Sequence, residues 1–211
     1  MGTEPQEETG AELLARILRQ RREQWEARTL DKYEADGRTP PKNWRERYTE
    51  PVEAQAGQLP ELPQGWCWAT VDQCSERIQY GTSSRTHPDA IGIPVLRMGN
   101  ITNHGTVDYR DLKYLPTDHG EFPELLLSPG DVIFNRTNSA DLVGKTAVFE
   151  RKEEFSLASY LIRVRPVEGC LPWWITWCII SPIGRAWIRT VLTHTAGQAN
   201  VNGTKLANYT I

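Results

Sequence analysis

The chain has 211 residues and a formal net charge of −3, from 24 basic and 27 acidic side chains. Hydrophobic residues make up 39% and charged residues 24%, so a packed core is expected and wholesale disorder is excluded. The charge balance also excludes a histone-like polycation, although a local basic face remains compatible with it.

The sequence shows no signal for export or for a membrane. The N-terminus is acidic and lacks an apolar core, and no apolar run reaches the roughly 18 residues of a membrane helix. The longest candidate, residues 171–180, is too short and contains Pro172. Cysteines 67, 74, 170 and 178 form no CxxC pair, which favours free thiols in a reducing compartment over a zinc site. We therefore expect a cytoplasmic protein without a metal site or a membrane partner.

The first predicted element is a long helix. Residues 1–10 are expected to form a disordered tail and 11–36 a helix, because Ala, Leu, Arg, Glu and Gln dominate its first 18 positions. Thr9 is a candidate cap with Glu12 as its capping-box partner. The helix carries an apolar stripe, which needs either its own domain or a second helix to cover it. The stripe consists of Leu14, Ile17, Leu18 and Trp25.

The rest of the chain predicts a linker followed by an α+β domain. Residues 37–62 are rich in proline and glycine and are expected to be extended, with Trp44 and Tyr48 lying against a surface. Residues 63–211 are expected to form one domain of mixed strands with a C-terminal helical part. The predicted strands are 66–71, 95–101, 131–135, 143–149 and 160–164, followed by a helix over 172–192 broken at 181–182 and a polar loop over 193–204.

Enzyme motifs are weak. Residues 144–146 (GKT) resemble the end of a phosphate-binding loop, but Ser139 stands where that loop requires glycine. Asp89, Asp111 and Lys113 mimic the acid–acid–lysine pattern of metal-dependent nucleases, whose carboxylates hold Mg²⁺ from neighbouring strands. Here the residues fall in loop-like stretches, so the pattern stays an alternative and not the leading interpretation.

Polar segments point to nucleic acid instead. Residues 80–86 combine hydroxyls with an arginine, a composition that suits phosphate oxygens. Arginine and asparagine, which read guanine and adenine edges, recur in 97–101 and 135–139, and amides follow in 198–205. Residues 155–211 carry five basic groups and one acid, a net +4 against −7 for the remainder. This asymmetry is expected of a protein with one face toward a polyanion.

The ordered motifs resemble one family. The runs LPQGWCWATVDQ, YGTSSRT, VLRMGNI, GDVIFNRTNSADLVGKTAVF, ASYLIRVRP and TAGQANVN are similar to one target recognition domain of the specificity (S) subunits of type I restriction–modification systems. The upstream LLARILRQRREQWE resembles the conserved spacer helix that precedes such a domain. The resemblance covers nearly all of residues 11–211.

The resemblance implies a non-catalytic subunit that recognises double-stranded DNA in a host-defence system. Full S subunits carry two recognition domains, each reading half of a split target, and two helices that pair antiparallel. Methyltransferase (M) subunits supply the S-adenosylmethionine chemistry, and restriction (R) subunits add ATP- and Mg²⁺-dependent cleavage, so no cofactor is implied for this chain. With one domain and one helix, the chain is expected to be a fragment or a half-subunit that needs a second S half or helix.

The resemblance also assigns candidate sites. Thr82, Ser83 and Arg85 are expected to contact phosphates, and Lys205 the DNA backbone. The helix stripe becomes a contact with a second helix or an M subunit. The alternatives are the nuclease above and a protein-interaction module without DNA contact. The candidates for base edges are Arg97, Asn100, Arg136, Asn138, Gln198 and Asn202.

Overall fold

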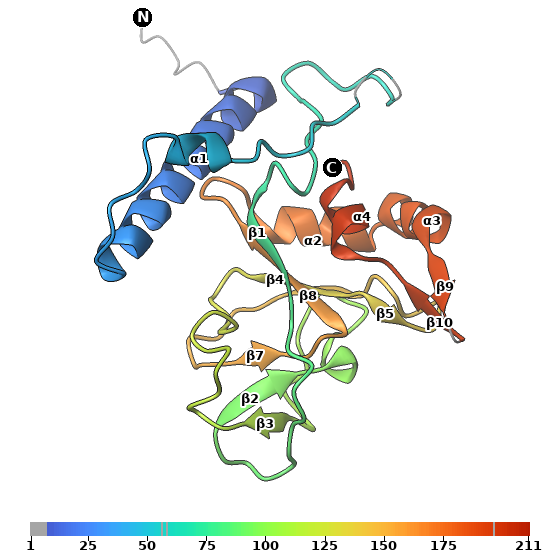
Figure 1. Ribbon diagram of the computed structural model, residues 1–211. Helices are drawn as coiled ribbons and strands as arrows, with labels where there is room; N and C mark the ends of the chain where they lie inside the picture. The colour runs from blue at the N-terminus through green and yellow to red at the C-terminus, as the bar shows by residue number, and fades with distance from the viewer. Residues whose placement is uncertain (1–7, 56, 58, 196) are drawn as a thin grey trace, which may run out of the picture. The chain divides into compact units, whose positions relative to one another are not determined.

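The computed structural model divides the chain into two compact units (Figure 1). It describes residues 8–55, 57, 59–195 and 197–211; of the predicted N-terminal tail, residues 1–7 lie outside them. Unit 1 runs up to Glu76 and includes Val167–Cys170 and Asn208–Ile211, whereas unit 2 comprises Arg77–Pro166 and Leu171–Ala207. Helices and strands both occur, which confirms the predicted α+β class.

Unit 1 contains the long helix α1 (Gly10–Ala35). The predicted capping box is present: the Glu12 amide donates to the Thr9 hydroxyl, and the Thr9 amide donates to the Glu12 carboxylate at 2.9 Å. The helix ends where Gly37 adopts a φ of +63°, a conformation that glycine reaches without steric cost. Local capping signals therefore place the start of this helix to within one residue.

The linker packs on α1 within unit 1. The Trp25 ring stacks on Trp44, in the short 3-10 helix η1 (Trp44–Arg47), with 5.8 Å between centroids, and it meets Tyr48 edge-on at 5.3 Å. This confirms that Trp44 and Tyr48 lie against a surface. The strand predicted over 66–71 is wrong: it makes only the isolated bridge of Thr70 with Thr210.

Unit 2 contains three sheets. The largest has the strand order β1-β8-β4-β6, and β4 is antiparallel to both its neighbours. In the second, of order β3-β2-β7, β2 is antiparallel to β3 and parallel to β7. The third, of order β5-β10-β9, is antiparallel throughout. The strands are β1 (Ser75–Tyr80), which begins in unit 1, β2 (Ile93–Leu96), β3 (Lys113–Leu115), β4 (Val132–Asn135), β5 (Thr137–Asn138), β6 (Thr146–Val148), β7 (Ser156–Leu157), β8 (Leu161–Pro166), β9 (Thr193–Thr195) and β10 (Gln198–Asn200).

Several predicted strands need correction. Those over 131–135 and 160–164 are confirmed as β4 and β8, and the one over 143–149 shortens to β6. The strand predicted over 95–101 ends at Leu96, because the Asn100 side chain folds the chain into a 3-10 turn, η3 (Met98–Asn100). The loop predicted over 193–204 is wrong, because it forms the β9–β10 pair and the start of α4 (Gly203–Ala207).

The C-terminal helices follow the prediction closely. The helix expected over 172–192 is broken into α2 (Pro172–Ile180) and α3 (Pro182–Val191). Each has proline in its first turn, and the Ser181 hydroxyl caps α3 by accepting from the Gly184 amide at 3.1 Å. Helix α2 packs against β6 and β4, so it covers the largest sheet.

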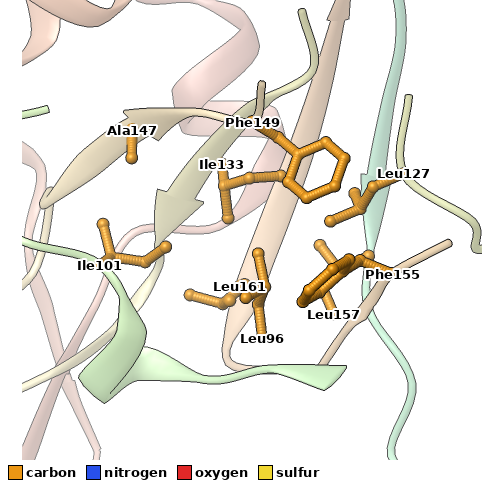
Figure 2. Packing of buried hydrophobic residues seen from close by; sticks show 9 residues of the cluster. All are labelled: Leu96, Ile101, Leu127, Ile133, Ala147, Phe149, Phe155, Leu157 and Leu161. Atoms are coloured by element: carbon orange, nitrogen blue, oxygen red, sulfur yellow. The ribbon is translucent and has the colours of Figure 1, made fainter. Parts of the chain in front are cut away.

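The core of unit 2 is formed by apolar side chains from several strands and loops (Figure 2). Strand β4 is buried along its whole length, and Ile133 belongs to the cluster. Half-buried Tyr109 packs at its edge and lies edge-on to the Phe155 ring at 5.4 Å. The cluster consists of Leu96, Ile101, Leu127, Ile133, Ala147, Phe149, Phe155, Leu157 and Leu161.

Two glycines with similar backbone conformations give a test of this packing. Gly92 has a φ of +99°, and a Cβ there would stand 2.1 Å from the Leu115 carbonyl oxygen. Gly130 has a φ of +93°, but its nearest obstacle, Pro172 Cγ, is 3.6 Å away. Both alanine variants carry the left-handed strain, so Gly92→Ala should lower the free energy of unfolding by a further ~1–3 kcal/mol. Urea unfolding measures the difference, and equal losses would contradict the assigned close approach.

Candidate nucleic-acid interface

Two of the predicted polar segments meet on the third sheet. Asn138 of β5 stands opposite Ala199 of β10, which stands opposite His194 of β9. The Asn200 amide nitrogen donates to the Thr137 hydroxyl at 2.7 Å. Segments about sixty positions apart in the sequence therefore lie side by side, and a hydrogen bond between their side chains adds to the strand pairing that sets their register.

The side-chain amides of Gln198 and Asn138 on this sheet differ in their exposure and in their hydrogen bonds. Gln198 is exposed. Asn138 is half-buried, and its side-chain oxygen accepts from the Ser139 amide at 2.8 Å. Among the described residues, no acceptor takes a hydrogen bond from the Asn138 amide nitrogen. Both residues therefore keep donors available to a ligand.

Arg136 connects β4 to β5 and is held from several sides. Its amide donates to the Tyr160 carbonyl at 3.0 Å, and its carbonyl accepts from Val201 at 2.9 Å. Its guanidinium lies over the Tyr80 ring at 4.9 Å, and its Nη1 donates to the Ser159 carbonyl at 3.3 Å. The side chain therefore has a fixed orientation, which a flexible surface arginine lacks.

In the loop over 80–86, Thr82, one of the predicted phosphate contacts, makes its hydrogen bonds within the protein instead. Thr82 is 3% exposed; its hydroxyl donates to the Glu121 carboxylate and accepts from the Ser84 amide at 3.0 Å. Ser83 and Arg85 are exposed, as a phosphate contact requires. The Ser84 hydroxyl lies 2.9 Å from His119 Nε2, a partner that sequence reasoning missed because it is 35 positions away and no motif marks it.

Asn100, one of the predicted base-edge contacts, also makes its hydrogen bonds within the protein. It is 3% exposed, its side-chain oxygen accepts from the Arg97 amide at 2.8 Å, and its nitrogen donates to the Asp108 and Arg110 carbonyls at 2.9 and 2.8 Å. Arg97 Nη2 donates to the Asp111 carbonyl at 2.5 Å, where Asp111 has a φ of +52°. In this conformation Asn100 has no amide hydrogen left for a ligand, and the pair shapes the segment over 97–111.

The two candidates at the C-terminal end are joined by helix α4. The exposed Asn202 accepts from the Lys205 amide at 2.8 Å through its side-chain oxygen, which caps the helix. The Lys205 ammonium donates to the Val191 carbonyl at 2.6 Å. Both residues thus have hydrogen-bond partners within the protein, and the side-chain amide hydrogens of Asn202 stay available to a ligand.

The net charge of residues 155–211 overstates their basic surface. Arg163 is fully buried, its Nη1 donates to the Leu126 carbonyl at 2.7 Å, and desolvation lowers the pKa of its guanidinium to about 10. Arg165 pairs with the Asp131 carboxylate at 2.7 Å, and Arg185 donates to the Asp141 carbonyl at 2.8 Å. Three of the five cations therefore stabilise the fold, so the charge count indicates no exposed patch of that size.

The helix stripe is partly used within unit 1. Ile17 is 3% exposed and Trp25 stacks on Trp44, whereas Leu14 and Leu18 are half-buried. Trp25 is therefore engaged inside the unit and Ile17 is buried, whereas part of Leu14 and Leu18 stays accessible. The partner-contact role of the stripe stays a prediction.

The nuclease alternative requires side chains that are placed together to hold a metal ion. Asp89 lies in an exposed loop, Asp111 at a turn and Lys113 on β3. Within the described ranges, no group of three or more His, Cys, Asp or Glu side chains is placed to hold a metal ion. The four cysteines form no disulfide bond, and no described helix is long and apolar enough to cross a membrane. The geometry therefore does not favour the nuclease.

Comparison with known proteins identifies relatives. No family model matches the sequence. Over 129 residues, 60% of this chain, it is 29% identical to the type I restriction enzyme EcoKI specificity subunit of Escherichia coli strain K12, covering 28% of that protein. Over 157 residues, 73% of this chain, it is 25% identical to the putative type I restriction enzyme MjaX specificity subunit of Methanocaldococcus jannaschii, covering 37% of it.

The fold is also found among solved structures. With a TM-score of 0.52 and 17% identity, 94% of this chain matches 44% of a chain from a structural study of complex assembly and conformational transition of the type I R-M system. The chain thus spans less than half the length of each of these proteins. The resemblance to type I specificity subunits is confirmed.

The assignment of Asn100 to the scaffold can be tested by its stability cost. Asn100→Ala leaves the Arg97 amide and two partly buried carbonyls without their partner, so the free energy of unfolding should fall by ~1–3 kcal/mol. Asn103, exposed in the same segment, is the matched control, and Asn103→Ala should change stability little. Chemical denaturation followed by tryptophan fluorescence compares the two. If the two variants were equally stable, Asn100 would again be a candidate for contacting base edges.

Proposed function

Because the chain is a relative of type I specificity subunits, we propose that it is a sequence-specific DNA-recognition module that reads one half of a two-part target. The observation that carries this proposal is the convergence of the segments over 135–139 and 198–202 on one small sheet. There, Arg136, Asn138 and Gln198 keep hydrogen-bond donors that the fold does not use.

The shape of this region supports readout in a groove. Figure 1 places β5, β9 and β10 at one end of unit 2, apart from β2, β3 and β7. A two-stranded ribbon fits the major groove of B-DNA, where each base pair presents a distinct pattern of donors and acceptors. Amide and guanidinium groups supply complementary patterns for adenine and guanine. The β9–β10 pair, flanked by Arg136 and Asn138, has this architecture.

We also propose that this chain performs no catalysis and that partner subunits carry the chemistry. In this arrangement, M subunits supply methyl transfer from S-adenosylmethionine and R subunits supply ATP- and Mg²⁺-dependent cleavage. The names of the two relatives, both specificity subunits of restriction enzymes, support this division of labour. A second S half would then read the other half of the target, and a second helix would pair with α1.

The proposal is tested most directly by methylome sequencing of cells that carry this chain with its cognate M subunit. We expect one modified motif that disappears when the gene for this chain is deleted. The spacing of the motif will show whether it is split, and its symmetry will show whether two copies of this chain cooperate. A methylome that is unchanged by the deletion would contradict the recognition role.

Arg85 should contribute affinity without sequence preference. Because it is exposed beside Ser83, we expect Arg85→Ala to weaken binding of the assembled complex to all duplexes and to reduce the salt slope of log K by about 1. Lys152, also exposed in unit 2 but outside the four polar segments, provides the control, and Lys152→Ala should leave the slope unchanged. Binding titrations at several salt concentrations measure both variants. An unaltered slope for Arg85→Ala would remove it from the phosphate contacts.

Arg136 should contribute sequence preference. Arg136→Ala is expected to lose about 1–3 kcal/mol of discrimination at one base pair and to relax the preference there only. Competitive selection from a randomised duplex library with the assembled complex measures the preference at every position. A uniform loss of affinity with the preference intact would instead make Arg136 a phosphate contact.

A further inference from the structure

We propose that Tyr80 is a positioning residue for Arg136 and that its ring determines how sharply Arg136 discriminates between bases. This inference rests on the proposed function, since it concerns the same DNA-reading site. Tyr80 was not among the residues that the sequence motifs singled out as readers. Its ring contacts Arg136 and its hydroxyl contacts Gly203, and both contacts lie within unit 2.

The first observation is how the donors of Arg136 are disposed. Its Cζ lies 4.9 Å from the Tyr80 ring centroid, and Nη1 donates to the Ser159 carbonyl at 3.3 Å. Its Nε is buried and finds no acceptor in the part of the chain that the structure describes. Among the described residues, nothing accepts a hydrogen bond from Nη2, which is not buried. The guanidinium is thus held by its face and one end, and the free end carries the remaining donors.

The second observation is that the Tyr80 ring is itself fixed. Its hydroxyl accepts from the Gly203 amide at 2.7 Å, at the start of α4. A Cβ on Gly203 would lie 3.2 Å from that hydroxyl and 3.4 Å from Cζ, so the glycine backbone lies against the ring. Tyr80 therefore connects the end of β1, the β4–β5 junction and the start of α4. The same side chain thus links the segment that carries Arg136 to the start of the helix that carries Lys205.

A fixed ring under an arginine affects discrimination more than affinity. The guanidinium is planar and recognises guanine through two parallel hydrogen bonds, so selectivity depends on the plane and direction of the fork. A free arginine reaches many acceptors, phosphates included, and distinguishes bases poorly. Stacking on an aromatic face restricts the plane, and the partial desolvation shown by the buried Nε strengthens the attraction of the cation to the ring. The expected signature is a loss of base preference at the position read by Arg136, with general DNA binding retained.

The experiment uses the complete chain assembled with its methyltransferase subunits and a randomised duplex library as the probe. Tyr80→Leu should lower discrimination at the base pair affected by Arg136→Ala by roughly 2- to 30-fold, although Arg136 is still present. Tyr80→Phe, which keeps the ring and loses only the hydrogen bond from Gly203, should retain most of the preference. The matched control is Tyr109→Leu, which removes the second arginine–tyrosine stack of unit 2, that of Arg151 at 3.8 Å, and should leave every base preference unchanged.

A second measurement keeps the fold constant. Phenylalanine analogues with one, two or three fluorines at position 80 preserve the shape of the ring while weakening its negative face. Discrimination at the Arg136 position should fall stepwise along this series, and a purely structural role of Tyr80 would give no such trend. In the Arg136→Ala background, Tyr80→Leu should cause no further loss of preference, because the two residues act as a unit.

The outcomes separate this inference from the proposed function. If Arg136→Ala relaxes one base pair while Tyr80→Leu and the fluorinated series leave it sharp, the positioning role is wrong and DNA recognition stands. If Arg136→Ala changes no preference, the assignment of Arg136 as a reader is wrong, and this inference falls with it. If the assembled complex selects no sequence from the library, the proposed function itself is overturned.

Discussion

The burial of strand β4 is the constraint on which the candidate interface depends. All four residues of β4 (Val132–Asn135) are buried, between β8 on one side and β6 on the other. Because the strand has neighbours on both edges and α2 packs against it, its register and its end point cannot shift without disrupting the core. Arg136 follows directly, and β5 begins one residue later. The core therefore fixes the point at which the chain leaves it, and the first polar groups after that point inherit this position.

Several polar side chains of unit 2 make their hydrogen bonds to other groups of the protein and not to solvent. Thr82 donates to Glu121, Asn100 uses its whole amide on three backbone groups, and Asn200 bonds Thr137. Such saturation rigidifies loops that have little apolar material of their own. It also divides the polar residues into two groups by the donors that they have left. A residue with saturated donors holds the site in shape, whereas Arg136 and Gln198 have groups left to recognise something else.

Sequence reasoning predicts what is encoded locally and misses what depends on distant partners. The Thr9–Glu12 cap, the break at Ser181 and the buried strands β4 and β8 follow from neighbouring residues, and all are present. Strand β10 was predicted as loop, since Gln198, Ala199 and Asn200 have the composition of one. It becomes a strand because β5, about sixty residues earlier, supplies pairing partners, and no local pattern announces a contact at that separation.

In the candidate site, too, sequence reasoning misses what depends on contacts between distant residues. Residue type marks Asn and Arg as side chains able to read bases, but it does not show which of them the fold has already engaged. Asn100 and Asn138 look equivalent in sequence, because each stands near the end of a predicted strand and close to an arginine. In the structure, one is 3% exposed with its amide used up, and the other keeps two amide hydrogens.

Under the proposed function, this division between scaffold and reader would let one fold serve different targets. If the residues that shape the loops were also the readers, a change of specificity would cost stability each time. Here Thr82, Asn100 and Asn202 maintain the loops through bonds within the protein, so residues such as Gln198 can vary while the backbone keeps its course. Arg136 is the exception, since it is stacked on Tyr80 and bonded to Ser159, and its orientation is part of the packing. A reader fixed in this way gains selectivity from rigidity but cannot be exchanged alone, because its platform would have to change with it.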